Sequence, residues 1–288
     1  MIPAILAFAA GAGALAWATS RYAATMLDPP VVANVRGRPV AVSLGVALAV
    51  AMIFTIVPAG LGVLRSGDAP GGRTDLLLAA SIASIFLAGL HDDRSGGRAR
   101  GLRGHLSALA RGRVTSGIVK LVVAVAAATV MALALRARGA ELWAGIPFIA
   151  GASDAFNLLD VAPGRAQKWG LLGAVALVPV AAPVAVANLA GALVVLLPAD
   201  LRERAMLGDA GSNVIGFALG VALFDIMATG WLWVALAVVV LLHVVAETVT
   251  LSRVIDAVPP LRWFDRIGRF PDPDAGTNGH VTARDPEI

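Results

Sequence analysis

Residues 41–63 read Ala-Val-Ser-Leu-Gly-Val-Ala-Leu-Ala-Val-Ala-Met-Ile-Phe-Thr-Ile-Val-Pro-Ala-Gly-Leu-Gly-Val, without a single charged side chain. A helix needs about 20 residues to cross a hydrocarbon layer about 30 Å thick, so this run is long enough to span a membrane. Inside lipid, every backbone N–H and C=O group must find an internal partner, which favours a helix. The run therefore predicts a transmembrane helix.

Similar runs recur along the chain, which is 58% hydrophobic and 15% charged, with a mean hydropathy of +0.80. A soluble domain averages about 45–50% apolar and about 25% charged residues. We predict membrane helices at 2–20, 41–63, 75–91, 115–135, 142–158, 169–183, 185–199, 213–228 and 230–250. Pro179 and Pro183 leave open whether residues 169–199 form two helices or one kinked helix. The predicted fold is an all-α, polytopic membrane bundle of about nine to ten helices over residues 1–251.

The positive charges predict an orientation for this bundle. If the N-terminus lies outside and nine helices alternate, the inner segments are 21–40, 92–114, 159–168, 200–212 and the chain from 251. These segments hold most of the Arg and Lys residues, whereas the outer loops hold only Arg65, Arg73, Arg136 and Arg138. This bias follows the positive-inside rule. We therefore expect a multi-pass protein of the plasma (inner) membrane.

The ends of the chain suggest a retained first helix and a non-spanning tail. No basic residue precedes the first apolar run, and the first arginine is Arg21, which favours a retained helix over a cleaved signal peptide. Residues 252–270 mix apolar residues with arginines, and this predicts a cytoplasmic interfacial segment. Residues 271–288 have the composition of a disordered tail.

The composition excludes several classes of function. The chain has no cysteine, so disulfides, thiolate catalysis and cysteine-ligated metals are ruled out. The net charge of +4 does not indicate nucleic acid as a partner, because the basic residues lie between apolar runs where membrane topology explains them.

Polar residues gather where the predicted helices meet the inner face. Asp92 and Asp93 end the third helix, Asn157 and Asp160 end the fifth, and Asp209 opens the eighth. Ionisable residues at membrane depth are costly and commonly functional. Asn157 and Asp160 are one turn apart on a helix face, and their oxygens are ligands that Mg²⁺ prefers. These residues predict a magnesium site at the cytoplasmic face.

Cations accompany the predicted site. The loop 94–113 combines glycines with arginines, which suits a diphosphate or an anionic lipid head. Lys120 lies just inside the fourth helix, where it could reach a phosphate. Taken singly, each acid is more commonly a helix cap or a solvated helix end. By the same standard we interpret Asp154, Asp225 and His243 as structural.

At these residues the chain resembles the polyprenyl-phosphate N-acetylhexosamine-1-phosphate transferases, the phospho-MurNAc-pentapeptide translocase-like enzymes of glycosyltransferase family 4. The resemblance runs from about residue 34 to residue 269. It is carried by short motifs in the family's order, namely Asn34-Val-Arg36-Gly-Arg38-Pro39, Gly89-Leu-His-Asp92-Asp93, Gly101-Leu-Arg-Gly-His105-Leu, Thr115-Ser-Gly-Ile-Val-Lys120, Asn157-Leu-Leu-Asp160 and Leu207-Gly-Asp209-Ala-Gly-Ser212.

The resemblance implies transfer of a sugar-1-phosphate from a UDP-sugar to undecaprenyl (polyprenyl) phosphate, with release of UMP, in cell-envelope glycan and cell wall synthesis. It implies Mg²⁺ as cofactor, with Mn²⁺ as the alternative, and we keep a homodimer as an option. Asp92 and Asp93 would be catalytic, and Asp209, Asp160 and Asn157 would bind the metal. The resemblance also implies that Lys120 and Arg36 hold phosphate oxygens. We add His105, Arg165, Glu247 and Arg253 to the predicted substrate-binding residues.

The chain also departs from the family pattern. Asp160 is followed by Val161-Ala-Pro163-Gly164-Arg165-Ala-Gln-Lys168, where the family usually has Gly-x-Asp-Gly, so an acid is lost and two cations appear. The stretch from Glu247 to Asp256 stands in place of a histidine-rich loop. The chain therefore resembles a variant branch of the family, and its sequence does not specify the donor sugar. A non-catalytic lipid-binding or scaffold homologue is the alternative. A secondary transporter is a weaker one, because it would need polar residues at mid-bilayer and a repeat between halves, and Asp154 alone gives little basis for it.

Overall fold

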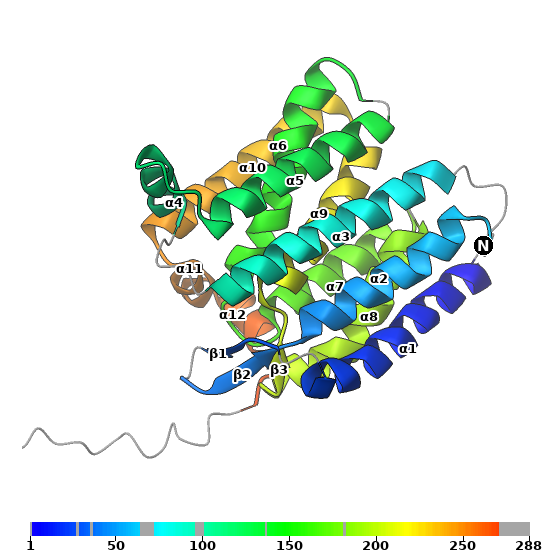
Figure 1. Ribbon diagram of the computed structural model, residues 1–288, viewed down its shortest axis with the longest axis horizontal. Helices are drawn as coiled ribbons and strands as arrows, with labels where there is room; N and C mark the ends of the chain where they lie inside the picture. The colour runs from blue at the N-terminus through cyan, green and yellow to red at the C-terminus, as the bar shows by residue number, and fades with distance from the viewer. Residues whose placement is uncertain are drawn as a thin grey trace, which may run out of the picture.

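The computed structural model describes residues 2–26, 29–34, 37–63, 72–95, 101–135, 137–180 and 183–270, and these form a helical bundle (Figure 1). The helices are α1 (Ile2–Met26), α2 (Leu44–Gly60), α3 (Gly72–Ser95), α4 (Gly101–Ala110), α5 (Ser116–Ala134), α6 (Ala140–Leu159), α7 (Arg165–Leu177), α8 (Pro183–Leu201), α9 (Gly208–Ile226), α10 (Thr229–Thr248), α11 (Leu251–Ala257) and α12 (Pro259–Arg266).

Seven helices in the described ranges are long and apolar enough to cross a membrane: α1, α3, α5, α6, α8, α9 and α10. The helical class and the membrane character predicted from the sequence are confirmed to this extent. Helix α2 has 17 residues and α7 has 13, so both are shorter than the other long helices. The question at Pro179 and Pro183 is resolved, because α7 ends at Leu177 and α8 begins at Pro183 as a separate helix.

Helix α9 forms the centre of the bundle, and most of its residues are buried. It packs against α3 and α6, with α2 and α7 beside them. Gly216 makes the close crossing with α6 feasible, because a Cβ there would lie 2.2 Å from the carbonyl oxygen of Ala152. Helix α10, by contrast, exposes apolar residues such as Trp231 and Leu241 along its outer face. Such a continuous apolar surface suits contact with lipid.

A small sheet that the sequence did not predict lies at one end of the bundle. Strand β1 (Val31–Ala33) pairs antiparallel with β2 (Pro39–Val42), and β2 pairs parallel with β3 (Ala205–Met206). The helix expected over 41–63 is therefore wrong at its start, since α2 begins at Leu44. The β-branched residues Val40 and Val42 favour an extended backbone here.

We call this the sheet end of the bundle. Figure 1 shows α4, α11 and α12 gathered at the same end as the strands, away from the N-terminus. Helix α4 lies in a stretch that we expected to be a loop. The segments that the charge pattern placed on the inner side of the membrane thus lie together at one end. The tail predicted over 271–288 lies outside the described residues.

Candidate functional site

The N-terminus of α9 is the point where the separate motifs meet. The Asp93 carboxylate accepts hydrogen bonds from the backbone N–H groups of Asp209 at 2.9 Å and Ala210 at 3.0 Å. The Asp160 carboxylate accepts the N–H of Gly208. The first N–H groups of a helix have no acceptor within the helix, and its N-terminus favours negative charge. Asp93 and Asp160 therefore cap α9 and fix its first turn.

Glycines allow the neighbouring helices to approach this turn closely. A Cβ at Gly89 of α3 would lie 2.6 Å from the carbonyl oxygen of Asp209. A Cβ at Gly45 of α2 would lie 2.6 Å from the backbone nitrogen of Gly211. Gly208 has φ +66°, a left-handed conformation that favours glycine. These glycines let α2 and α3 pack directly against the backbone that carries Asp209.

Lys120 of α5 lies at the centre of the site. Its Nζ atom is 2.6 Å from Oδ2 of Asp209 and 3.4 Å from carboxylate oxygens of both Asp92 and Asp154. The Asn157 amide donates to the same Asp209 oxygen at 3.3 Å. We call these five residues the lysine-centred cluster. Four helices, α3, α5, α6 and α9, contribute to it.

Asp154 and His243 belong to this site, although we interpreted both from the sequence as structural. Nε2 of His243 lies 3.2 Å from Oδ2 of Asp154, and its Nδ1 lies 2.8 Å from the carbonyl oxygen of Val239. Both ring nitrogens therefore face an acceptor. A signal for Asp154 was present, because Asp154 and Asn157 of α6 and its C-cap residue Asp160 follow one another at helical spacing. For His243 of α10 the sequence carried no comparable signal.

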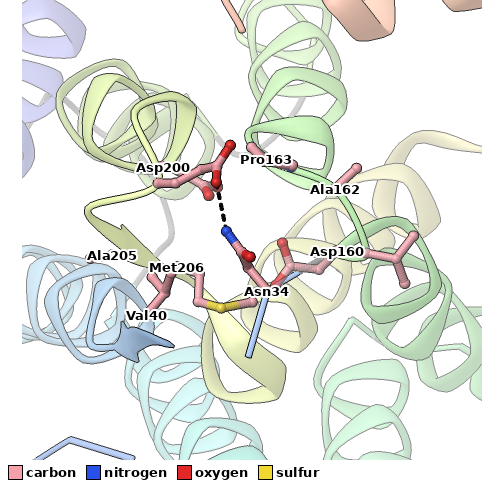
Figure 2. A pocket seen from close by; sticks show the side chains of 10 residues that line it. Asn34, Val40, Asp160, Ala162, Pro163, Asp200, Ala205 and Met206 are labelled. Atoms are coloured by element: carbon pink, nitrogen blue, oxygen red, sulfur yellow. Dashed lines mark hydrogen bonds between the residues drawn. The ribbon is translucent and has the colours of Figure 1, made fainter. Parts of the chain in front are cut away.

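Asp160 faces a cavity beside the cluster. The cavity has a volume of about 290 Å³ and is bounded by β2, β3 and the ends of α6 and α8 (Figure 2). Asn34 and Glu203 also line it, and the Asn34 amide donates to Glu203 at 2.6 Å. Loss of solvent and the nearby carboxylates of Asp200, Asp209 and Asp93 raise the pKa of Asp160 well above its usual range. The cavity thus joins an apolar wall to a strongly acidic rim.

The remaining predicted site residues lie outside the cluster. His105 of α4 hydrogen-bonds the Thr115 hydroxyl at 2.8 Å, at the N-cap of the helix that carries Lys120. Glu247 of α10 lies against Gly101 of α4. Arg253 is exposed on α11. Arg36 lies outside the described residues.

Arg165 also lies away from the cluster. It is buried and pairs with Asp265 of α12 through two hydrogen bonds of 2.8 and 3.0 Å. The structure therefore brings together Asp92, Asp93, Asn157, Asp209 and Lys120. Asp160 lies at the N–H of Gly208, the first residue of α9.

The donor set fits a hard divalent cation such as Mg²⁺. The single positive charge of Lys120 is shared by three carboxylates, and the carboxyl groups of Asp93 and Asp160 lie close to them. Within the described part of the chain, no three Asp, Glu or His side chains are grouped to hold a metal by themselves. Magnesium commonly takes one or two carboxylates and completes its shell with water and substrate phosphates. A cation here would use Asp209 and Asn157 in that manner, and Asp160, the third predicted ligand, lies at the N–H of Gly208.

Comparison with known proteins adds no identification. No protein-family model matches the chain, and no curated protein matches it significantly. The functional interpretation therefore depends on the residues and their geometry.

Proposed function

We propose that this protein is a membrane phosphoglycosyltransferase that moves a sugar-1-phosphate, of the N-acetylhexosamine type, from a UDP-sugar to a polyprenyl phosphate. In this proposal α2 and α7 also cross the membrane, which gives nine spans with the N-terminus outside. The sheet end then faces the cytoplasm at the inner membrane, where a nucleotide sugar is available. Cell-envelope glycan synthesis is the corresponding process.

One observation carries the proposal. Carboxylates from α3, α6 and α9 meet the ammonium of Lys120 at a helix N-terminus, at the end of an apolar bundle. A scaffold would not require this concentration of charge, because each partly buried ion must be compensated. A site that must bind two anionic substrates and a cation does require it.

The reaction needs two anions to approach each other in line. An oxygen of the lipid phosphate attacks the β-phosphorus of the donor, a new P–O bond forms, and the bond to the bridging oxygen breaks as UMP leaves. Catalysis of such transfers consists mostly of positioning and electrostatic stabilisation. Asp92 would accept the proton of the acceptor phosphate or orient it. Lys120 would turn from the carboxylates toward phosphate oxygens and offset their charge.

A bound Mg²⁺ would supply charge neutralisation at the diphosphate. Asp209 and Asn157 would hold it, while Asp93 accepts two backbone N–H groups and keeps the first turn of α9 in place. Asp93 would thus position the first turn of α9, whereas Asp92 would contact the acceptor phosphate itself.

The cavity beside Asp160 is the proposed binding site for the nucleoside of the donor. Its walls include Val161, Pro163 and Met206, which suit the faces of a base. Asp200 and Glu203 at its rim can accept hydrogen bonds from ribose hydroxyl or base N–H groups. Asp160 lies between this cavity and the α9 N-terminus, so a diphosphate could extend from one to the other.

The test uses the full chain in detergent with undecaprenyl phosphate, Mg²⁺ and a panel of UDP-sugars. We expect UMP release and a lipid product whose mass identifies the sugar. Asp209→Asn should abolish transfer, whereas Asp225→Asn, an exposed position near the other end of the same helix, should leave it intact. A panel without any product would favour the non-catalytic lipid-binding alternative. Full turnover by Asp209→Asn would contradict the site assignment.

A further inference from the structure

Buried cations follow the loop 160–164, and they are bound by the C-terminal segment. Arg165 is 3% exposed and Asp265 of α12 is also 3% exposed. Arg165 donates to both carboxylate oxygens of Asp265, and Arg269 donates to the same carboxylate at 2.6 Å. Arg165 also reaches the hydroxyl of Ser252 at 3.0 Å. Asp265 is therefore the common partner of two guanidinium groups from distant parts of the chain.

Lys168 binds the end of α12 in a second way. Its Nζ atom donates to the carbonyl oxygens of Phe264 and Ile267, each at 3.1 Å, and to that of Asp265. The last carbonyls of a helix have no donor within the helix, and its C-terminus favours a positive charge. The rings of Trp169 and Phe264 pack with their centroids 4.8 Å apart. The start of α7 and the end of α12 thus form one packed unit.

The loop between α6 and α7 is held on two sides. Nε of Arg269 donates to the carbonyl oxygen of Pro163 at 3.1 Å. On the other side, the Asp200 carboxylate of α8 accepts the N–H of Gly164, and it also accepts the Gln167 amide at 2.9 Å. Gly164 has φ +70°, so its conformation favours glycine. The backbone that follows Asp160 therefore has anchors from both α8 and the C-terminal segment.

Burial of this many charges requires a reason. Paired charges in the interior give little net stability, because their loss of solvent offsets their attraction. An amphipathic segment that only rested on a membrane would keep its charges in solvent, as Arg266 and Asp256 do at the outer surface, where each is more than half exposed. The inner contacts of α12 are better explained by a need to hold the loop in one position.

We propose that residues 259–269, which we call the C-terminal clip, position the loop 160–164 and thereby set Asp160 against the α9 N-terminus and the adjoining cavity. Asp265 is the central positioning residue of this clip. Its effect on catalysis rests on the proposed function, whereas its effect on the loop does not.

The test compares Asp265→Asn with Asp256→Asn, an exposed acid on α11, in the full-length chain. Hydrogen exchange reports on the loop independently of any activity. We expect peptides that cover 160–168 to exchange at least about tenfold faster in Asp265→Asn, because the loop loses its anchor, while peptides of α9 and the Asp256→Asn protein stay unchanged. We also expect kcat/KM for the UDP-sugar to fall by about tenfold or more, with KM for the lipid acceptor within about twofold.

The outcomes separate the two proposals. Faster exchange in a protein whose wild-type form transfers no sugar phosphate would leave the clip standing and overturn the proposed function. Unchanged exchange in Asp265→Asn, or faster exchange with unchanged transfer, would overturn the clip as a positioning element. If Asp265→Asn does not fold, Arg269→Gln provides the same comparison, because it removes the contact with Pro163 and leaves the Arg165–Asp265 pair intact.

Discussion

The amino group of Lys120 lies 2.6 Å from the carboxylate of Asp209, although 89 positions separate the two residues in the chain. The same amino group is 3.4 Å from Asp92 and from Asp154. One positive charge thus serves three carboxylates at the meeting point of four helices. This unequal balance of charge is the basis of the first prediction.

Replacement of Lys120 by methionine should destabilise the protein by about 2–3 kcal/mol, since the loss of one partner of a buried ion pair costs about 3–5 kcal/mol and these groups are partly exposed. We expect millimolar Mg²⁺ to restore part of this loss, because a divalent cation can neutralise the same carboxylates. Thermal unfolding in detergent, with and without Mg²⁺, measures both effects. A Lys120→Met protein as stable as wild type, or one indifferent to Mg²⁺, would argue against a cation at this site.

Substitutions of Asp93 and of its neighbour Asp92 should have different effects on stability and on transfer. Asp93→Asn weakens two hydrogen bonds to the N-terminus of α9, and loss of such a cap costs about 1–2 kcal/mol. We therefore expect Asp93→Asn to lower the unfolding temperature, and Asp92→Asn to abolish transfer with a smaller effect on stability. Asp75→Asn, at the other end of α3, is the control. If instead Asp92→Asn lowers the unfolding temperature and Asp93→Asn abolishes transfer with little effect on stability, the roles of the two acids are reversed.

Asp154 and His243 test the part of the site that the sequence did not reveal. Asp154→Asn keeps the size of the side chain but removes one of the three carboxylates around Lys120. His243→Gln removes the ring that holds Asp154. We expect each variant to lower kcat/KM by about tenfold, or about 1.4 kcal/mol, with little change in unfolding temperature. His91→Gln, an exposed position on α3, is the matched control, and equal activity in all three variants would return Asp154 and His243 to a structural role.

Gly89 tests the close contact between α3 and α9. An added Cβ at this position would meet backbone atoms of Asp209 and Ala210 at 2.6–2.7 Å, and overpacking of this kind costs about 1–3 kcal/mol. Gly89→Ala should therefore reduce both stability and transfer. At Gly230 of α10 a Cβ meets nothing within 4 Å, so Gly230→Ala changes helix propensity alone. If the two alanine variants behave alike, the separation of α3 and α9 does not control the site.

Much of the helical fold could be predicted, because uninterrupted apolar runs have few alternatives in a membrane. The run over 115–135 corresponds to α5 and the run over 142–158 to α6, within a few residues. Ala41 and Val42, the end of the strand Pro39–Val42, were mistaken for the start of a helix because an apolar run does not distinguish a strand from a helix over a few residues. Pairing with β1 and β3, which lie elsewhere in the chain, decides that stretch.

Part of the candidate site could also be anticipated. Asp92, Asn157 and Asp209 were singled out because oxygen-bearing residues at helix ends are unusual in so apolar a chain, and the structure brings them together. Arg165 was assigned to substrate by its charge alone. Its burial against Asp265, 100 positions away, shows that charge type does not predict a partner.

The sequence by itself determined that this chain forms apolar helices and that its polar residues concentrate at one end of them, because lipid admits few other arrangements of the backbone. Only the tertiary structure decided which charges meet. The ammonium of Lys120 among three carboxylates, the pair of His243 with Asp154 and the clip around Asp265 each join residues from different helices. Such contacts depend on how helices pack, and no local pattern of residues specifies that packing.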